Sequence, residues 1–201
     1  MLAAMESGAV KTAVTAPPVT AVYLALTCHI WRTAGWPQWN WNDPEYRVDA
    51  DGILRRQGSF SRPSSIGSGR WFKGKIFAVA WHSSTFRHIY NRFYQQFYRQ
   101  GELETFAAVT AAARDWVQTN YPGTIFEVIW WPEKPSDNAA VLPLLKAHGL
   151  NITPIETILP DFHKDETKYR IPGDGHPNVL AHRLIGEYIA THFLPVKPSQ
   201  K

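Results

Sequence analysis

Three short runs of apolar and β-branched residues alternate with stretches of helical periodicity, and this alternation limits the folds open to the chain. The runs cover residues 19–27, 124–130 and 152–158. Continuous apolar runs of this length are typical of strands that are buried on both faces of a parallel sheet. Strands that alternate with helices indicate an α/β fold with a mostly parallel sheet.

Apolar residues at three- and four-residue spacing predict four helices and support a weaker fifth one at the start of the chain. Gly101 and Gly149 are expected to stop the helices that precede them, and Pro143 is an awkward interior residue. We expect one domain over 19–195, an N-terminal segment over 1–18 and a tail over 196–201. The predicted helices cover residues 84–99, 103–120, 138–148 and 179–193, with the weaker one at 1–13.

Residues 29–74 differ in kind from the rest of the chain, because tryptophan, glycine, proline and serine dominate them. The stretch 58–69 is rich in serine and glycine, and we expect the whole segment to be a long loop inserted into the domain. Its aromatic side chains have two interpretations: they pack the loop over the sheet, or they stack on sugar rings or an acyl chain. The aromatic residues concerned are Trp31, Trp36, Trp39 and Trp41 with Tyr46, and Trp71 lies further along the same segment.

Composition excludes several classes of protein. With 201 residues and 44% hydrophobic side chains the chain can bury a sizeable core, and its single cysteine, Cys28, excludes an intramolecular disulfide. The 21 Lys+Arg are scattered among 17 Asp+Glu, so we expect no nucleic-acid partner. Residues 1–10 lack the basic start of a signal peptide, and the apolar stretch 19–28 is too short to span a membrane. A cytoplasmic location is therefore the default expectation.

Residues 171–185 carry the clearest chemical pattern. A loop rich in glycine and proline places Asp174 and His176 just ahead of an amphipathic helix. Pro177 keeps His176 out of the helical region, and Asn178 suits the N-cap of the helix. Asp174 is close enough to accept the Nδ1 proton of His176, which would leave Nε2 free to act as a general base. The alternative is that Asp174 caps a turn and His176 only packs.

The segment GDGHPNVLAHRLIGEYIA at 173–190 resembles the last conserved block of the SGNH (GDSL-type) hydrolases. Softer similarity extends over about 19–193, through the apolar strand at 19–27, the strand that ends at Trp131-Pro132, and the helix–glycine–strand step at 145–153. This resemblance implies a three-layer α/β/α, flavodoxin-like sandwich with a mostly parallel sheet. It also implies an ester hydrolase that acts on a small ester or an acylated carbohydrate, with no cofactor and no metal.

In that family a Ser attacks the acyl carbon, and the resemblance assigns His176 as its base and Asp174 as the orienting carboxylate. The family's Asp commonly stands three residues before the His, whereas Asp174 stands two before. No Gly-Asp-Ser occurs in the chain, so we expect a domain without its first strand and nucleophile, which is inactive in this shortened form. Ser7 and Ser68 both lack a preceding strand and are poor substitutes.

Cys28-His29 occupies the place where the family carries an Asn after the strand at 19–27. His29 and Trp31 are therefore weak candidates for contacts with the oxyanion or the substrate, whereas Cys28 suits a buried, inert thiol better than a nucleophile. The alternation of acidic residues and His163 over 161–165 suits a solvated loop better than a metal site. Two other functions remain open: a non-catalytic carbohydrate-binding or interaction module that uses the Trp31–Trp41 loop, and an O-acyltransferase that acts on polysaccharide.

Overall fold

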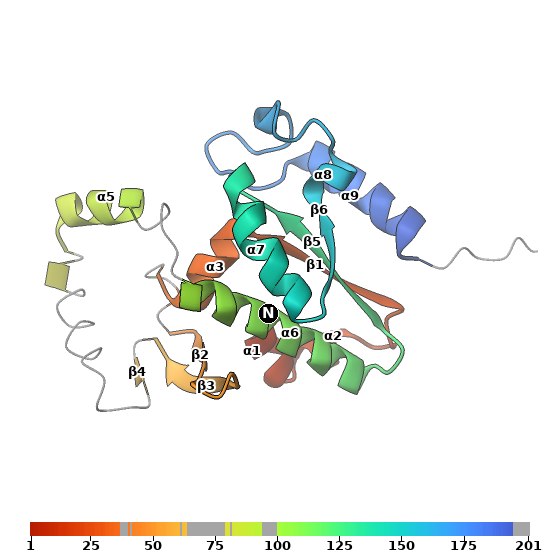
Figure 1. Cartoon of the computed structure of the whole chain (residues 1–201), viewed down its shortest axis with the longest axis horizontal. Helices are drawn as coiled ribbons and strands as arrows, with labels where there is room; N and C mark the ends of the chain where they lie inside the picture. Colours follow the sequence, from red (N-terminus) through yellow and green to blue (C-terminus); the bar gives the residue numbers. More distant parts are fainter. Residues whose placement is uncertain are drawn as a thin grey trace, which may run out of the picture.

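The computed structural model describes residues 1–36, 40, 42–60, 62–63, 79–80, 82–93 and 100–194, which form two sheets flanked by helices (Figure 1). The strands are β1 (Thr20–Leu26), β2 (Pro44–Val48), β3 (Leu54–Ser59), β4 (Arg62–Pro63), β5 (Ile125–Trp131) and β6 (Asn151–Pro154). The α-helices are α1 (Leu2–Glu6), α2 (Ala9–Ala13), α3 (Thr27–Ala34), α5 (Ser84–Phe93), α6 (Gln100–Asn120), α7 (Pro135–Ala147), α8 (Ile155–Ile158) and α9 (Val179–His192).

The larger core is organised by a parallel sheet in the order β1-β5-β6. Leu26 at the end of β1 pairs with Trp131 at the end of β5, and Trp130 pairs with Pro154 at the end of β6. The carboxyl ends of all three strands therefore lie at one edge of the sheet. This confirms the α/β fold with a mostly parallel sheet that the alternating runs predict.

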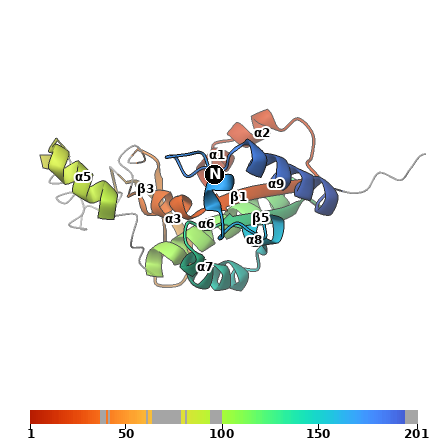
Figure 2. The same ribbon diagram turned by 90° about the horizontal axis from the view of Figure 1, so that it is seen from above.

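Helices cover both faces of this sheet, because successive side chains of β5 point in opposite directions. Val128 and Trp130 pack with Phe106 of α6 in one cluster, whereas Trp131 packs with Ile185 of α9 in a second cluster. Figure 2 shows α9 on one side of β1 and β5, and α6 and α7 on the other. The predicted three-layer α/β/α architecture is thus present. Both tryptophans are fully buried, so truncating either to Ala should destabilise the domain by about 3–5 kcal/mol.

The stretch 29–74 is not the uninterrupted loop that its composition predicts. It includes most of α3, and a second, antiparallel sheet in the order β2-β3-β4. The turn between β2 and β3 is stabilised by Asp49, whose Oδ1 accepts hydrogen bonds from the backbone N–H groups of Asp51 and Ile53. Gly52 in this turn has φ +77°, which a glycine adopts without strain. Trp39, Trp41, Trp71 and residues 64–70 lie outside the described residues.

Three other local predictions differ from the structure. The run 152–158 is a strand only as far as Pro154, which has no backbone N–H and is the N-cap of the helix α8. Gly101 belongs to the first turn of α6 rather than ending the preceding helix. The segment 1–13 divides at Gly8, whose φ of +82° separates α1 from α2.

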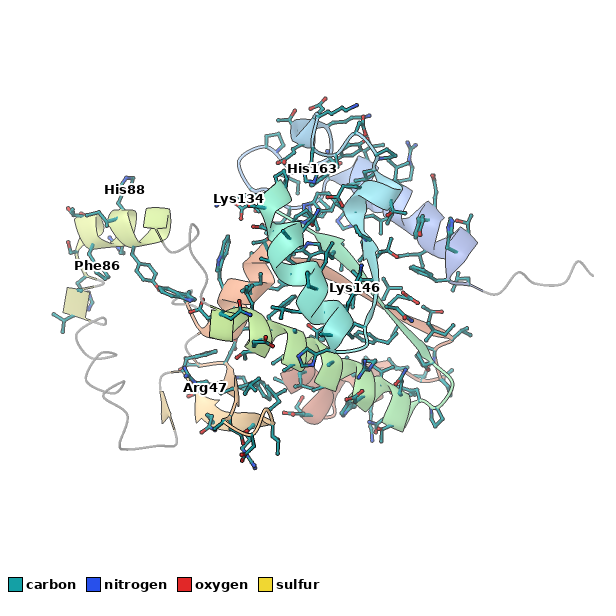
Figure 3. All side chains as sticks on the ribbon, viewed as in Figure 1. Arg47, Phe86, His88, Lys134, Lys146 and His163 are labelled. Carbon is teal, nitrogen blue, oxygen red and sulfur yellow. The ribbon has the colours of Figure 1, made fainter. Side chains whose placement is uncertain are left out.

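The remaining helices agree with their sequence patterns. The predicted helix at 179–193 is α9, with Asn178 at its N-cap accepting a hydrogen bond from the Ala181 N–H at 3.1 Å. Pro143 is exposed within α7, so its ring does not disturb the core. Figure 3 shows Phe86 and His88 on α5, away from the parallel sheet, and residues 94–99 of that predicted helix lie outside the described ones. Within the described residues, no helix combines the length and apolar character needed to cross a bilayer.

Candidate active site at the carboxyl edge of the sheet

The carboxyl ends of β1 and β5 meet the loop that precedes α9. Thr27 follows β1 directly, and Pro132 follows β5. A hydrogen bond from Arg170 Nη2 to the carbonyl oxygen of Pro132, at 3.0 Å, connects the loop to the end of β5. Figure 3 shows Lys134 and His163 at this same end of the molecule. Because ligands of open α/β sheets bind beyond the carboxyl ends of the strands, this edge is the place to look for a site.

The loop of residues 171–176 is a compact hairpin. The Ile171 N–H donates to the His176 carbonyl at 2.8 Å, and the Ile171 carbonyl accepts from the N–H groups of Asp174 and Gly175. Gly173 and Gly175 have φ of +78° and +79°, so both positions favour glycine. Only Gly175 separates Asp174 from His176, and the turn of the hairpin places their side chains next to each other.

Asp174 and His176 form the hydrogen bond that the sequence predicts. The distance from His176 Nδ1 to Asp174 Oδ1 is 2.6 Å, and the side chains are 49% and 54% exposed. An ionised carboxylate only accepts, so Nδ1 carries the proton of the neutral imidazole and Nε2 carries the lone pair. Over the described part of the chain, Nε2 makes no hydrogen bond. His176 is thus arranged as a general base and Asp174 as the carboxylate that orients it, and both side chains are accessible to solvent.

His29 occupies a contrasting environment at the start of α3. Its Nδ1 accepts hydrogen bonds from the Tyr23 hydroxyl at 2.8 Å and from the Leu26 N–H at 3.3 Å. Burial lowers the pKa of His29 to about 4, and the positive charge of Arg32 and the proximity of His176 add to this shift. The ring is therefore neutral at pH 7, and the remaining proton is on Nε2. His29 offers an N–H donor in the neighbourhood of His176.

Cys28, beside His29, is suited to packing rather than to attack. Burial raises the pKa of its thiol, and the negative charge of Glu133 adds to this effect while Arg32 opposes it. The thiolate, which is the nucleophilic form, is disfavoured by such surroundings. The structure favours the interpretation of Cys28 as an unreactive thiol.

A buried polar network that sequence patterns did not reveal connects the ends of β1 and β5. The Thr27 hydroxyl donates to Asp137 Oδ2 at 2.8 Å and accepts from the Glu133 N–H at 2.9 Å. Asp137 is 2% exposed and also accepts from the Lys134 N–H. The one available signal was Asp137 in the first turn of a helix that begins at Pro135, because acidic residues there accept free N–H groups.

Of the tryptophans that suggested a substrate surface, the two that the structure describes, Trp31 and Trp36, are engaged in packing. Trp31 is 4% exposed, which favours a structural role over substrate contact. Trp36 lies 6.1 Å from Tyr90, centroid to centroid, and its Nε1 donates to Glu102. Because Trp39 and Trp41 lie outside the described residues, the proposed sugar-binding loop stays a prediction.

Of the two substitutes for a family-type nucleophile, only Ser7 lies among the described residues, and it makes no hydrogen bond to His176 there. The hydroxyl of Ser7 donates to the carbonyl of Ala4 at 3.1 Å within α1, and Ser68 lies outside the described residues. The acidic loop at 161–165 is held by internal bonds: Lys168 binds Asp161, and His163 binds Glu156. Among the described residues, no group of His, Cys, Asp and Glu side chains is arranged to hold a metal ion.

Comparisons of the chain with models of protein families, with curated proteins and with solved structures give no match. Any functional assignment therefore depends on the site itself.

Proposed function

We propose that the protein is an ester hydrolase of the SGNH type in which His176 is the general base and Asp174 orients it. The observation that carries this proposal is the 2.6 Å bond between His176 Nδ1 and Asp174 Oδ1, which leaves the lone pair of the neutral imidazole on Nε2 of a side chain that is 49% exposed. A base held in one tautomer beside the carboxyl ends of a parallel sheet is two-thirds of a nucleophile–His–Asp arrangement.

In the proposed reaction, Nε2 of His176 takes a proton from a hydroxyl as its oxygen attacks the acyl carbon of the ester. The imidazolium that forms is stabilised by Asp174, and it returns the proton to the leaving alcohol when the carbon–oxygen bond breaks. We assign His29 as a donor to the oxyanion that forms in this reaction. Its ring is neutral and carries a proton on Nε2, so it can donate a hydrogen bond without placing a second positive charge near the imidazolium of His176.

The attacking hydroxyl in the SGNH family belongs to a Ser. Within the described residues, no Ser hydroxyl is bonded to His176. Water has direct access to the half-exposed imidazole. In place of the inactivity expected from the missing nucleophile, we therefore propose that this chain hydrolyses activated esters slowly, by general base catalysis of water attack. General base catalysis alone contributes about 10²- to 10⁴-fold.

The test is the hydrolysis of p-nitrophenyl acetate by the native chain, by His176→Ala and by His182→Ala. His182 is an exposed histidine on α9, so its removal controls for the slow hydrolysis that any surface imidazole causes. We expect His176→Ala to lose at least about 10²-fold of the rate above background, and His182→Ala to match the native chain. Equal rates for the native chain and His176→Ala would refute the proposal.

Acyl transfer to an alcohol is a second candidate, favoured by the exposure of His176. An imidazole that is 49% exposed can be reached by a sugar hydroxyl as well as by water. Adding glycerol to the assay separates the two reactions. Both release p-nitrophenol, but transfer produces an acetylated glycerol whereas hydrolysis produces acetate.

A further inference from the structure

Arg170 lies directly before the hairpin that carries Asp174 and His176, and its side chain folds beneath it. Nη1 donates to the carbonyl oxygen of Gly175 at 3.1 Å, and Nη2 donates to the carbonyl oxygen of Pro132 at 3.0 Å. One guanidinium thus joins the residue between Asp174 and His176 to the residue that follows β5. The planar fork of an arginine suits this task, because its N–H groups have fixed relative directions.

The surroundings of Arg170 hold its guanidinium in place. The group lies over the rings of Trp131 and Phe162, with its central carbon 5.7 and 5.3 Å from their centroids. Nη2 is 3.3 Å from a carboxylate oxygen of Glu166, and the side chain is only 15% exposed. Because both aromatic rings belong to the buried core beneath the loop, the position of the guanidinium is set by the core rather than by solvent.

The hairpin needs such an anchor. Gly173 and Gly175 lack side chains that would restrict their backbone, and glycine is the most flexible residue in the chain. Rotation at Gly175 would move Asp174 and His176 relative to each other and relative to His29. Fixing the Gly175 carbonyl to the core removes this freedom at the point between the two functional side chains.

The geometry points to Arg170 as a positioning residue that holds the Asp174–His176 pair at the end of β5 by clamping Gly175 to Pro132. This inference rests on the proposed function, since it assigns Arg170 a part in the same site. Arg170 does not touch the reacting atoms. It acts through the backbone of the hairpin, so its loss should lower turnover while leaving substrate affinity nearly unchanged.

The experiment compares Arg170→Lys and Arg170→Gln with Arg183→Ala as the matched control. Arg183 is 65% exposed on α9 and is 3.8 Å from Glu187, so its removal deletes a guanidinium far less engaged than that of Arg170. Three readings are taken on each protein: kcat and KM for p-nitrophenyl acetate, the NMR resonance of the His176 Nδ1 proton, and the midpoint of thermal unfolding.

We expect Arg170→Gln to lower kcat by about 10- to 100-fold, the size expected for a misplacement of about 1 Å, with KM changed less than about twofold. The Nδ1 proton resonance of His176 should broaden or disappear, because its bond to Asp174 is no longer held. Arg170→Lys keeps the charge but donates to one carbonyl at a time, and it should recover only part of the rate. Arg183→Ala should retain the native kcat and the native resonance.

Unchanged kcat and an unchanged Nδ1 resonance in both Arg170 variants would overturn the inference. So would a loss of rate that only follows the loss of folded protein, since that outcome assigns Arg170 to packing alone. If Arg170→Gln does not fold, Arg170→Lys decides by the same readings. Failure of the proposed function is recognised separately, by equal rates in the native chain and His176→Ala; the resonance of His176 then still tests the clamp.

Discussion

Two histidines near the carboxyl edge of the parallel sheet have opposite surroundings and opposite tautomers. His29 is enclosed at the end of β1, where Nδ1 accepts from a tyrosine hydroxyl and a backbone N–H. His176 stands on an exposed hairpin, where Nδ1 donates to Asp174. The first ring therefore presents an N–H donor and the second a lone pair. The partner of Nδ1 therefore determines which chemistry the other nitrogen can perform.

The largest expected effect comes from Asp174→Asn, which changes the hydrogen-bond partner of His176 Nδ1. An amide at this position can donate to Nδ1 and so favour the wrong tautomer, in which Nε2 carries the proton. We expect the rate of p-nitrophenyl acetate hydrolysis to fall by about 10²- to 10⁴-fold. Asp165→Asn, on an exposed loop, is the control and should keep the native rate; a native rate for Asp174→Asn would contradict the assigned role.

The next largest effect on the rate should come from removing the Nε2–H donor of His29. His29→Phe keeps an aromatic ring that can stack on Tyr23, whose ring centroid is 5.6 Å from that of His29, but removes the Nε2–H donor. Loss of one oxyanion donor should lower kcat by about 10²-fold. His29→Asn restores a donor and should recover part of the rate. If both variants hydrolyse the ester as fast as the native chain, His29 takes no part in the reaction.

The pH dependence of stability should separate the two histidines as well. Because the pKa of His29 is lowered to about 4 in the folded state, the unfolded chain binds more protons than the folded one between pH 4 and about 6.5. The free energy of unfolding should therefore decrease as pH falls through this window, by at most about 1.4 kcal/mol per pH unit. Urea unfolding at several pH values should show a smaller slope for His29→Phe than for the native chain. Identical slopes would mean that His29 is not buried as a neutral ring.

The smallest effect should come from loosening the junction between β1 and α3, next to His29. Thr27→Val removes the hydroxyl that joins Asp137 to the Glu133 N–H, although Asp137 keeps its bonds to backbone N–H groups. We expect a loss of about 1–2 kcal/mol in the free energy of unfolding. Thr167→Val, where the hydroxyl binds Asp165 on an exposed loop, should cost much less. Equal losses in the two variants would show that the buried Thr27 network adds no more stability than the exposed Thr167 hydrogen bond.

The sequence predicted those helices and strands whose apolar residues follow a clear local pattern. The strands β1 and β5 are continuous apolar runs, and α9 has an N-cap and an apolar face that are readable in sequence. The hairpin β2–β3 was missed because β3, LRRQGS, is short and polar and has no clear alternation. The end of β6 was misjudged because Ile155 and Ile158 suit a strand by composition, whereas Pro154 and the packing of Ile155 determine a helix.

The residues of the candidate site likewise fall into those that a local sequence pattern predicted and those that it did not. Asp174 and His176 are two residues apart, so a single loop pattern was enough to predict their bond. Arg170, Thr27 and Asp137 act through backbone carbonyls or partners from distant segments, for example Arg170 on Pro132 and Thr27 on Asp137. Such contacts leave no local spacing in the sequence, because they depend on how β1, β5 and the hairpin come together in three dimensions.

The most direct test of the opposite tautomers is long-range proton–nitrogen NMR of the histidine side chains at pH 7. We expect His29 to carry its proton on Nε2 and to stay neutral when the pH is lowered to 5. We expect His176 in its neutral form to carry its proton on Nδ1, and Asp174→Asn to reverse this preference without affecting His29. A charged His29 at pH 6, or a neutral His176 protonated on Nε2 in the native chain, would contradict the tautomers assigned to the two histidines.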